Sequence, residues 1–305
     1  MESDKESDNK YSPTISKISM LIAAILMGNV GLVVSLLSDY PAYTITLLRG
    51  IGGTLFLTLF MLKFHSFSKD FLKESFKLHW KHLLILGIMN PIIIGLYFLA
   101  IIISGYAIAA FLLYTGGIFV ICFLIIGKVE KVSKINILGF ILAIIGVAII
   151  MEFWTGQALS YGVLIGILSG ITYAIFMFCT KKIYIYRNNN ISKITTKGDI
   201  DILIAWFSTF FIIVLSLPLG ILDLFKLDLT DWLYVLILGL IPTALPFILF
   251  NIGLKNDKGG NILILSYFEP VVATINGIFF QQIFSIYTII GGALILIANI
   301  IVLFF

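Results

Sequence analysis

The stretch NILILSYFEPVVATINGIFF, residues 261–280, decides how the rest of the chain is interpreted. A helix of this length crosses the roughly 30 Å hydrocarbon core of a bilayer, yet this one carries Glu269 and Pro270 near its middle. A carboxylate at the bilayer centre costs roughly 3 kcal/mol or more, so it normally faces a cavity or a partner helix. Pro270 lacks a backbone N–H and is expected to kink the helix. Glu269 is therefore the first candidate functional residue; the alternative is a packing kink beside an acid that another helix satisfies.

The composition places the chain in the membrane class. Hydrophobic residues make up 60% of it and charged residues 12%, and the mean hydropathy is +1.10. A soluble domain is near half apolar and a quarter charged. The sequence therefore predicts an all-α integral membrane protein. Cys122 and Cys179 both fall in apolar runs, so neither a disulfide framework nor a paired-cysteine metal site is expected.

Ten apolar stretches have lengths that suit transmembrane helices. They cover approximately residues 16–37, 41–62, 82–103, 106–127, 135–153, 160–180, 201–222, 232–253, 261–280 and 284–305. The polar run over residues 1–15 lacks the apolar content to fold and is expected to be a disordered tail. Residues 64–81 predict a separate interfacial amphipathic helix, and the histidines in or beside it, His65, His79 and His82, are expected to be solvated.

The lysines and arginines are distributed unevenly between the two sides of the membrane. With ten spans, all of them except Arg49 and Lys226 fall on one side, whereas Asp39, Glu152 and Asp223 fall on or near the other. Loops rich in lysine and arginine stay in the cytoplasm. We therefore expect a multi-pass protein of the cell membrane with both termini in the cytoplasm. The excess of lysine and arginine thus reflects membrane topology, and the sequence contains no nucleic-acid-binding motif.

The two halves of the chain resemble each other weakly but continuously. Sliding the chain along itself so that Tyr114 falls on Tyr267 also sets Gly117 on Pro270, and it aligns LLYTGGIFVICFLIIG with LSYFEPVVATINGIFF without a gap. Each half, residues 16–153 and 154–305, would contain five spans. Because five is odd, the second half must enter the membrane in the opposite direction to the first. The pattern therefore predicts an inverted repeat.

These features resemble a known family. The P-x-x-x-x-x-L-x-R pattern in PAYTITLLRG (41–50), the stretch NPIIIGLYFLAIIISGYAIAAFLLYTGG (90–117) and the ending YFEPVVATINGIFFQQIFSIYTIIGGALIL (267–296) are similar to the drug/metabolite transporter superfamily, EamA type. The resemblance covers nearly the whole chain. It implies a secondary carrier with a central cavity between the two halves and alternating access.

Polar residues deep within the predicted spans are the candidate substrate-binding residues. Asparagine and tyrosine side chains can also hydrogen-bond between helices, so interhelical contacts are the alternative for each of them. The candidates are Asn29, Tyr97, Tyr114, Thr115, Tyr173, Asn251, Tyr267, Glu269 and Asn276. Glu269 is also the candidate coupling residue, because it could exchange a proton for substrate.

Other residues inside the spans have simpler expected roles. Pro91, Pro242, Pro246 and Pro270 are candidate gates or plain packing kinks. Arg49 is favoured as structural, with Asp39 or a substrate carboxylate as alternative partners. Gly162, Gly166 and Gly170 recur every four positions and are expected to allow close helix approach.

The function predicted from these features is secondary active transport of a small metabolite. A cavity with aromatic and amide groups and few charges suits an amino acid or another small amphipathic or zwitterionic compound. Export of an organic cation or drug stays open, as does a scaffold or receptor that transports nothing. No P-loop or hydrolase motif is present, so neither an enzyme nor a cofactor or metal is expected. The expected partners are the substrate and the lipid bilayer, without nucleic acid, for a monomer or alternatively a dimer.

Overall fold

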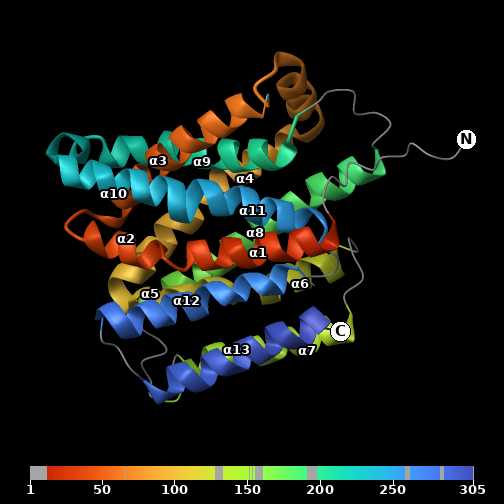
Figure 1. Ribbon diagram of the computed structural model, residues 1–305, viewed down its shortest axis with the longest axis vertical. Helices are drawn as coiled ribbons and strands as arrows, with labels where there is room; N and C mark the ends of the chain where they lie inside the picture. Colours follow the sequence, from red (N-terminus) through yellow and green to blue (C-terminus); the bar gives the residue numbers. More distant parts are fainter. Residues whose placement is uncertain are drawn as a thin grey trace, which may run out of the picture.

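The structure is a computed structural model of the 305-residue chain, and it describes residues 12–64, 66–127, 133–150, 152, 154, 161–190, 198–257, 262–281 and 285–304. The described part is helical, and its long helices lie side by side with roughly aligned axes, as Figure 1 shows. In chain order they are α1 (Pro13–Met27) with α2 (Val30–Leu36), α3 (Ala42–Lys63), α4 (Lys69–Ser104), α5 (Tyr106–Tyr114) with α6 (Gly116–Ile126), α7 (Lys134–Ile150), α8 (Tyr161–Asn189), α9 (Ile200–Gly220), α10 (Leu229–Gly239) with η5 (Leu240–Ala244) and α11 (Leu245–Lys255), η6 (Leu263–Tyr267) with α12 (Phe268–Asn276) and η7 (Gly277–Gln281), and α13 (Ile286–Phe304). A short 3₁₀ turn, η4 (Asp223–Lys226), joins α9 to α10.

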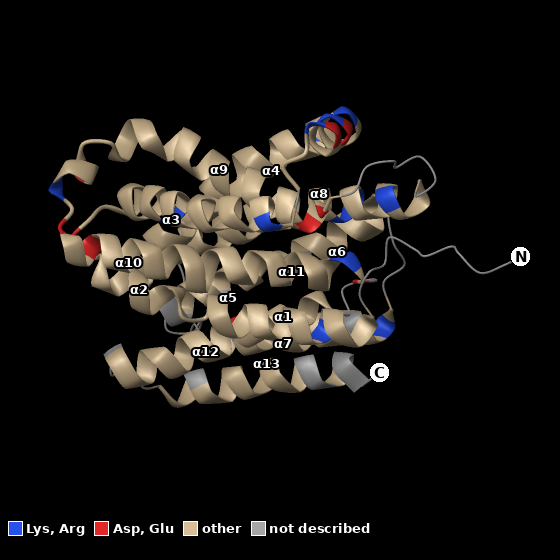
Figure 2. Cartoon of the chain, turned by 45° about the horizontal axis from the view of Figure 1, so that its top comes forward, with Lys and Arg blue, Asp and Glu red and all other residues tan. Residues whose placement is uncertain are grey.

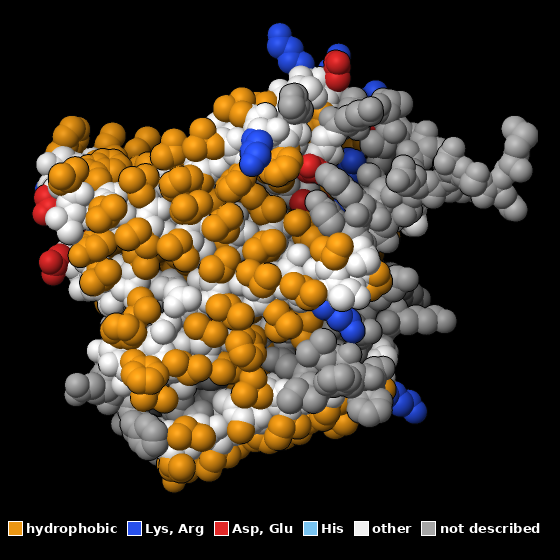
Figure 3. All heavy atoms as spheres, viewed as in Figure 1, with side chains coloured by type: hydrophobic (Ala, Val, Ile, Leu, Met, Phe, Trp, Pro, Cys, Tyr) orange, Lys and Arg blue, Asp and Glu red, His pale blue; other side chains and the backbone are white. Residues whose placement is uncertain are grey.

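The predicted all-helical membrane architecture is confirmed. Within the described residues, eight helical segments are long and apolar enough to span a bilayer, and two shorter apolar helices, Ile137–Gly146 and Ile289–Ala298, lie within α7 and α13. Hydrophobic side chains cover the face shown in Figure 3, and most of the described charged side chains visible there lie toward its edges. Leu229 and Phe225 are 87% and 84% exposed, and such exposure over a whole face fits contact with lipid rather than water.

The two ends of the helix bundle differ in charge. α1 begins and α13 ends on the same side of the bundle (Figure 1), and we call this the basic end because Lys17, Lys63, Lys134 and Lys255 lie near helix termini there. At the opposite, acidic end, the described segments that join α2 to α3 and α9 to α10, together with the first turn of α10, carry Asp39, Asp223, Asp228 and Asp231, with Lys226 among them. Figure 2 shows acidic side chains gathered at that end of the bundle. This separation of charge is the one the loop pattern predicts. Which end faces the cytoplasm stays a prediction.

Hydrogen bonds organise the acidic end. Asp228 accepts from the backbone N–H of Asp231 at 2.7 Å, and Asp231 accepts from that of Asp228 at 3.1 Å, which forms a capping box at the start of α10. The Tyr40 hydroxyl donates to Asp231 at 2.6 Å, and this bond raises the pKa of Tyr40 to about 12. Lys226 and Thr44 each donate to Asp223 at 2.6 Å and hold the pKa of that carboxyl below its usual range.

The helix contacts come in equivalent pairs, as expected for a protein built from two equivalent halves. α4, the third span, packs on α8, the sixth, and its equivalent pair, α1 with α11, is also among the most extensive contacts. The other two extensive pairs, α3 with α9 and α7 with α13, join spans that are equivalent to each other. Each of these pairs unites one helix from each half. The predicted boundary near residues 153 and 154 adjoins segments outside the described residues, so the exact division stays a prediction.

The predicted interfacial helix at residues 64–81 is wrong in one respect. α4 begins at Lys69, where the Ser68 side chain caps it, and it continues without a break through the third span to Ser104. Its first turns are therefore not a separate helix. His79 is 2% exposed rather than solvated, because its ring packs edge-on against Tyr186 of α8 with centroids 5.3 Å apart. His65 lies outside the described residues.

Several spans are broken near their middles. α1 ends at Met27 and α2 resumes at Val30, α5 ends at Tyr114 before α6, and the ninth span changes from the 3₁₀ helix η6 to α12 at Phe268. The last two breaks fall at positions that the internal repeat aligns, Tyr114 and Tyr267. Pro270 therefore lies in the first turn of α12, where its missing N–H costs no helical hydrogen bond. The structure shows a change of helix type two residues before Pro270, and a kink at Pro270 stays a prediction.

Candidate functional site

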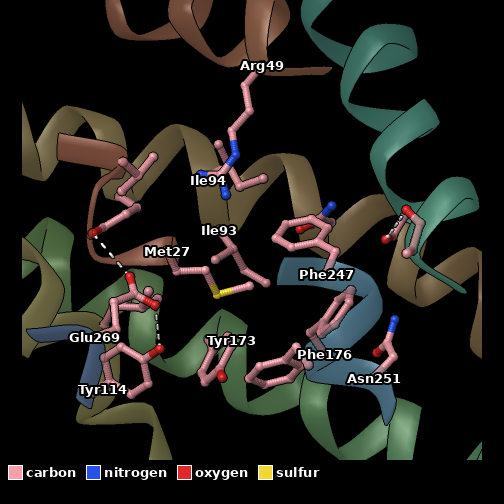
Figure 4. Close-up of a pocket in the computed structure, with 17 residues that line it drawn as sticks. Met27, Arg49, Ile93, Ile94, Tyr114, Tyr173, Phe176, Phe247, Asn251 and Glu269 are labelled. Atoms are coloured by element: carbon pink, nitrogen blue, oxygen red, sulfur yellow. Dashed lines mark hydrogen bonds between the residues drawn. The ribbon is translucent and has the colours of Figure 1, made fainter. Parts of the chain in front are cut away.

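A cavity lies in the middle of the bundle and receives side chains from both halves. α1, α2, α3, α4 and α5 contribute from the first half, and α8, α9, α11 and α12 contribute from the second (Figure 4). The lining residues are Met27, Val30, Arg49, Asn90, Ile93, Ile94, Tyr97, Leu113, Tyr114, Tyr173, Phe176, Ala205, Ser208, Phe247, Phe250, Asn251 and Glu269. Apolar and aromatic groups dominate the lining, and the few polar groups are placed among them, as in small-molecule sites generally.

Glu269 lies at one side of this cavity and is 3% exposed. Tyr114 of α5 donates its hydroxyl to Oε2 at 2.6 Å, and Tyr97 of α4 donates to Oε1 at the longer distance of 3.5 Å. Among the described residues, no lysine or arginine forms an ion pair with this carboxylate. Glu269 is thus held by two hydroxyl donors from the first half, and both could be exchanged for a ligand.

Arg49 enters the same cavity from α3 and is 4% exposed. Its Nε donates to Thr243 Oγ1 at 2.9 Å and its Nη2 donates to the Pro242 carbonyl at 3.0 Å, so it fastens α3 to the π-helical turn η5. The guanidinium also lies 5.4 Å from the ring centroids of both Phe98 and Phe247, within cation–π range. The structural role expected for Arg49 has a physical basis here, although Thr243 and Pro242 take the place of the suggested partner Asp39. Among the described residues that line this cavity, Arg49 is also the one arginine or lysine.

Two further polar groups in the lining make no hydrogen bond of good geometry within the described part of the chain. They are the buried Asn90 amide nitrogen of α4 and the buried Tyr173 hydroxyl of α8, beside which the Ser266 side chain lies. Asn251 of α11 differs, because its Nδ2 donates to the Asp201 carbonyl at 3.0 Å. A buried donor without a partner costs about 1–3 kcal/mol, so Tyr173 and Asn90 are groups that a ligand could satisfy.

The structure brings five of the nine predicted binding residues to the cavity: Tyr97, Tyr114, Tyr173, Asn251 and Glu269. The other four lie behind the lining or at helix breaks. Tyr267 donates to the Tyr114 carbonyl, and Thr115 donates to the Leu112 carbonyl at 2.7 Å. Asn276 donates to the Gly28 carbonyl at 3.1 Å and to Asn29 Oδ1 at 3.2 Å. These four therefore make helix contacts, and a role of the nine in substrate binding stays a prediction.

Comparison with known proteins assigns the chain. The model of the EamA-like transporter family matches residues 14–152 and again 160–304. The chain belongs to the EamA-like transporter family. It is thereby a member of the drug/metabolite transporter superfamily, as its sequence motifs predict. Each of the two matches covers five of the spans, which is consistent with duplicated halves.

Relatives of this EamA-like chain agree with that assignment. It is 28% identical over 286 residues to an "Uncharacterized transporter" of Archaeoglobus fulgidus, a match that covers 91% of this chain and 92% of the relative. A solved crystal structure of a protein that is 18% identical superposes with a TM-score of 0.70, over 95% of this chain and 97% of that one. At this identity the superposition shows a shared fold, and the family match supplies the function class, a transporter.

Small residues determine how closely helices approach around the cavity of this EamA-like protein. A methyl group on Gly28 would overlap Val272 and the Glu269 carbonyl, so α12 can lie against the break between α1 and α2 only with glycine there. The predicted glycine stripe is placed similarly. A methyl group on Gly162 would overlap Ser104, and one on Gly166 would overlap Leu112. A methyl group on Gly170 would lie too close to Thr115 and Gly116.

The candidate gating prolines occupy different kinds of position. Pro91 lies inside the continuous helix α4 beside Asn90, whereas Pro242 lies in the π-helical turn η5 and Pro246 in the first turn of α11. The Pro242 carbonyl accepts from Arg49, so this turn is tied to the cavity. A gating role for these prolines and for Pro270 stays a prediction.

Sequence reasoning assigned two cavity residues elsewhere. Asn90 is not among the binding residues that the sequence predicts, and Arg49 is expected there to be structural, yet both line the cavity. The sequence does mark both residues as candidates for the cavity, because each is a polar side chain inside an apolar span. The apolar lining, including Phe176 and Phe247, carries no such signal, because lipid-facing helix surfaces are equally hydrophobic.

Proposed function

We propose that this EamA-like protein is a secondary active transporter that moves a small zwitterionic metabolite, such as a neutral amino acid, by alternating access. One observation carries the proposal: a single buried cavity holds a carboxylate, Glu269, and a guanidinium, Arg49, among aromatic rings contributed by both halves. A zwitterion offers the complementary pair of charges. A highly anionic compound such as a sugar phosphate would need several cations, and Arg49 is the one cation among the lining residues that the structure describes.

The proposed binding mode assigns each charge to one side of the cavity. The substrate ammonium would replace the Tyr97 and Tyr114 hydroxyls at Glu269, and the substrate carboxylate would approach Arg49 and the unpartnered Asn90 amide. An apolar substrate side chain would contact rings such as Phe176 and Phe247. Charge-assisted hydrogen bonds are about twice as strong as neutral ones, so both ends of the zwitterion add affinity.

The proposed mechanism uses the duplicated architecture. Lining residues come from both halves, so rocking one half against the other would open the cavity first to one side and then to the other. Glu269 would couple this motion to a gradient, since it is either protonated or paired with a cationic ligand. The chain contains no P-loop, so the driving force would come from gradients rather than from ATP.

Export of an organic cation is the second candidate, and a specific observation favours it. Glu269 adjoins the rings of Tyr97, Tyr114 and Tyr173, and aromatic rings beside a carboxylate also suit a ligand that carries only positive charge. Arg49 favours the zwitterionic substrate over the organic cation, because a guanidinium in the cavity can bind a substrate carboxylate but repels a substrate that carries only positive charge.

A matched ligand series tests the proposal. Counterflow in proteoliposomes would be measured with neutral amino acids and, for the best of them, with its methyl ester, which lacks the carboxylate, and its N-acetyl form, which lacks the ammonium. The zwitterion should compete about tenfold better than either derivative, and Arg49→Lys should reduce its advantage over the ester. An ester that competes as well as the amino acid would support the organic cation instead. Absence of saturable flux for any compound would support a scaffold or receptor.

We further propose that the protein is a monomer of the cell membrane, with a dimer as the alternative, and that the basic end faces the cytoplasm. The charge asymmetry between the two ends supports the orientation (Figure 2). The relation of the termini to the cytoplasm is testable without a substrate, by labelling either terminus from one side of the membrane.

A further inference from the structure

A fully buried ion pair lies at the basic end, away from the cavity lining. Lys181 Nζ of α8 is 2.5 Å from Asp257 Oδ2, and the two side chains are 2% and 0% exposed. Asp257 follows the last turn of α11, where Asn256 ends the helix. The carrier mechanism proposed above makes no use of either residue. The cost of burying two charges requires an explanation.

Asp257 also holds the segment that leads to Glu269. Its other oxygen, Oδ1, accepts from the backbone N–H of Ile262 at 2.5 Å and from that of Leu263 at 2.9 Å. Leu263 begins η6, which runs directly into α12 and Glu269. One carboxylate therefore joins α8, through Lys181, to the start of the span that carries the cavity acid.

The adjoining residue extends this junction to the first half of the chain. Asn256 Nδ2 donates to Ser16 Oγ of α1 at 2.8 Å. α1 and α8 open the two halves and occupy equivalent places in them. The corner formed by Asn256 and Asp257 thus fastens the equivalent helices of both halves to each other at the basic end.

A second buried ion pair continues the charged layer towards the cavity. Lys255 Nζ lies 3.8 Å from Asp201 Oδ2, with side chains 9% and 3% exposed. The Asp201 carbonyl accepts from Asn251, which lines the cavity. Both ion pairs therefore belong to the basic end, and Asp201 connects them to Asn251 in the cavity lining.

A buried ion pair is a poor device for stability but a good one for selecting a state. Replacing both partners by uncharged side chains of similar volume is often neutral or stabilising, whereas removing one partner strands a buried charge. The pair at Lys181 and Asp257 therefore contributes less to the fold than its burial suggests. What it does specify is one arrangement of α8 relative to η6 and α11.

We propose that Lys181 and Asp257 form a latch that closes the cavity toward the basic end and that separates during the transport cycle. The proposal rests on the proposed transport function and deepens it by assigning one barrier of the alternating-access cycle. Separation would release η6 from α8 and let the Glu269 segment move. The adjacent pair of Asp201 and Lys255 would separate in the same step, because Lys255 lies only two residues before Asp257 in the chain.

The test measures access to the cavity and needs no substrate. A thiol is introduced as Ser208→Cys, at a buried position of the cavity lining, in a background with Cys122→Ala and Cys179→Ala. Its rate of reaction with a membrane-impermeant maleimide is then measured from the face of the membrane that carries the termini. The latch variant is Lys181→Met with Asp257→Asn, which removes both charges of the pair and keeps an oxygen that can accept from the backbone N–H groups of Ile262 and Leu263.

The latch variant should react at least tenfold faster than its parent from the terminus-bearing face. Lys226→Met is the matched control, since it removes a lysine paired with an aspartate at the acidic end, and it should leave this rate unchanged. A folded latch variant that reacts at the parental rate would overturn the proposal. A latch variant that fails to fold would overturn it too, because a contact that opens in every cycle cannot be essential to the fold.

Failure of the latch and failure of the transport proposal give different results. Unchanged thiol access together with normal counterflow would remove the latch and leave the transporter. Raised thiol access without saturable flux for any compound would leave a gated cavity in a protein that does not carry these substrates.

Discussion

Glu269→Gln tests the proposed site most directly, because the change removes the charge while it keeps the shape. The Gln carbonyl oxygen can accept from the Tyr114 hydroxyl, which now donates to Oε2 at 2.6 Å. The Gln amide nitrogen can donate to the Tyr97 oxygen, which lies 3.5 Å from Oε1. Both tyrosines keep a partner, so the variant should fold and purify like the parent.

The expected loss of affinity follows from the hydrogen bonds. A hydrogen bond to a charged group contributes about 1.5–3 kcal/mol net, and one between neutral groups about 0.5–1.5 kcal/mol. A substrate ammonium at Glu269 would therefore lose about 1.4 kcal/mol in the variant, which corresponds to about a tenfold higher Kd. The effect is confined to ligands that carry the ammonium. The N-acetyl derivative should bind the parent and the variant equally.

The same variant tests coupling. If the Glu269 carboxyl exchanges a proton for substrate, as proposed, transport by the parent should depend on pH between mildly acidic and mildly alkaline conditions. The pH profile of Glu269→Gln should then be flat. The assay is counterflow and gradient-driven uptake in proteoliposomes at matched protein content. Tyr97→Phe is the control, since it removes one hydroxyl and keeps the acid, so its pH dependence should remain. If Glu269→Gln keeps the parental rate and profile, the acid is structural and coupling lies elsewhere.

Four further outcomes are expected. Reporter fusions or cysteine labelling should place both termini in the cytoplasm; an external terminus would remove the basis for the proposed orientation. Asn251→Ala should weaken substrate binding and leave a folded protein; normal binding would make Asn251 a packing residue. Gly117→Ala should lower stability by about 1–3 kcal/mol, because the added methyl overlaps the Tyr267 hydroxyl, and an unchanged melting temperature would contradict that packing. Asp223→Asn should lower the melting temperature at neutral pH and have a smaller effect in acid. Lys226 lowers the pKa of Asp223, so the stability that the ionised Asp223 carboxylate contributes is present above the usual carboxyl range and is lost as pH falls. An equal change in melting temperature at both pH values would contradict this.

The sequence was sufficient for the architecture because span length and charge bias are properties of whole segments. A hydrophobic run long enough for the bilayer has few alternatives to a membrane helix, so α3, predicted at 41–62, is found at Ala42–Lys63. The internal repeat was informative at single-residue level as well. It aligned Tyr114 with Tyr267, and these are the positions where the fourth and ninth spans break.

The candidate site was less predictable, because an apolar span gives no sign of which face turns inward. Asn29, Asn90 and Asn276 are all amides inside predicted spans, yet Asn29 and Asn276 hydrogen-bond to each other across a helix contact, while Asn90 reaches the cavity. In a soluble bundle the polar face would show each helix's orientation, but here lipid and core select similar side chains. α4 illustrates the same limit, since its amphipathic first turns look separate in sequence and are continuous in the structure.

The broken helices of the two halves meet at Glu269, and this contact would connect the proposed substrate site to the proposed latch. Tyr114 donates to Glu269, and its carbonyl accepts from Tyr267, the last residue of η6. The other end of η6 is held by Asp257 through Leu263. A 3₁₀ helix has poorer hydrogen-bond geometry than an α-helix, so a short one between two anchors is the part of the span that can change at low cost. A substrate that displaces Tyr114 from Glu269 would therefore disturb η6 at one end, and separation of the latch would release it at the other.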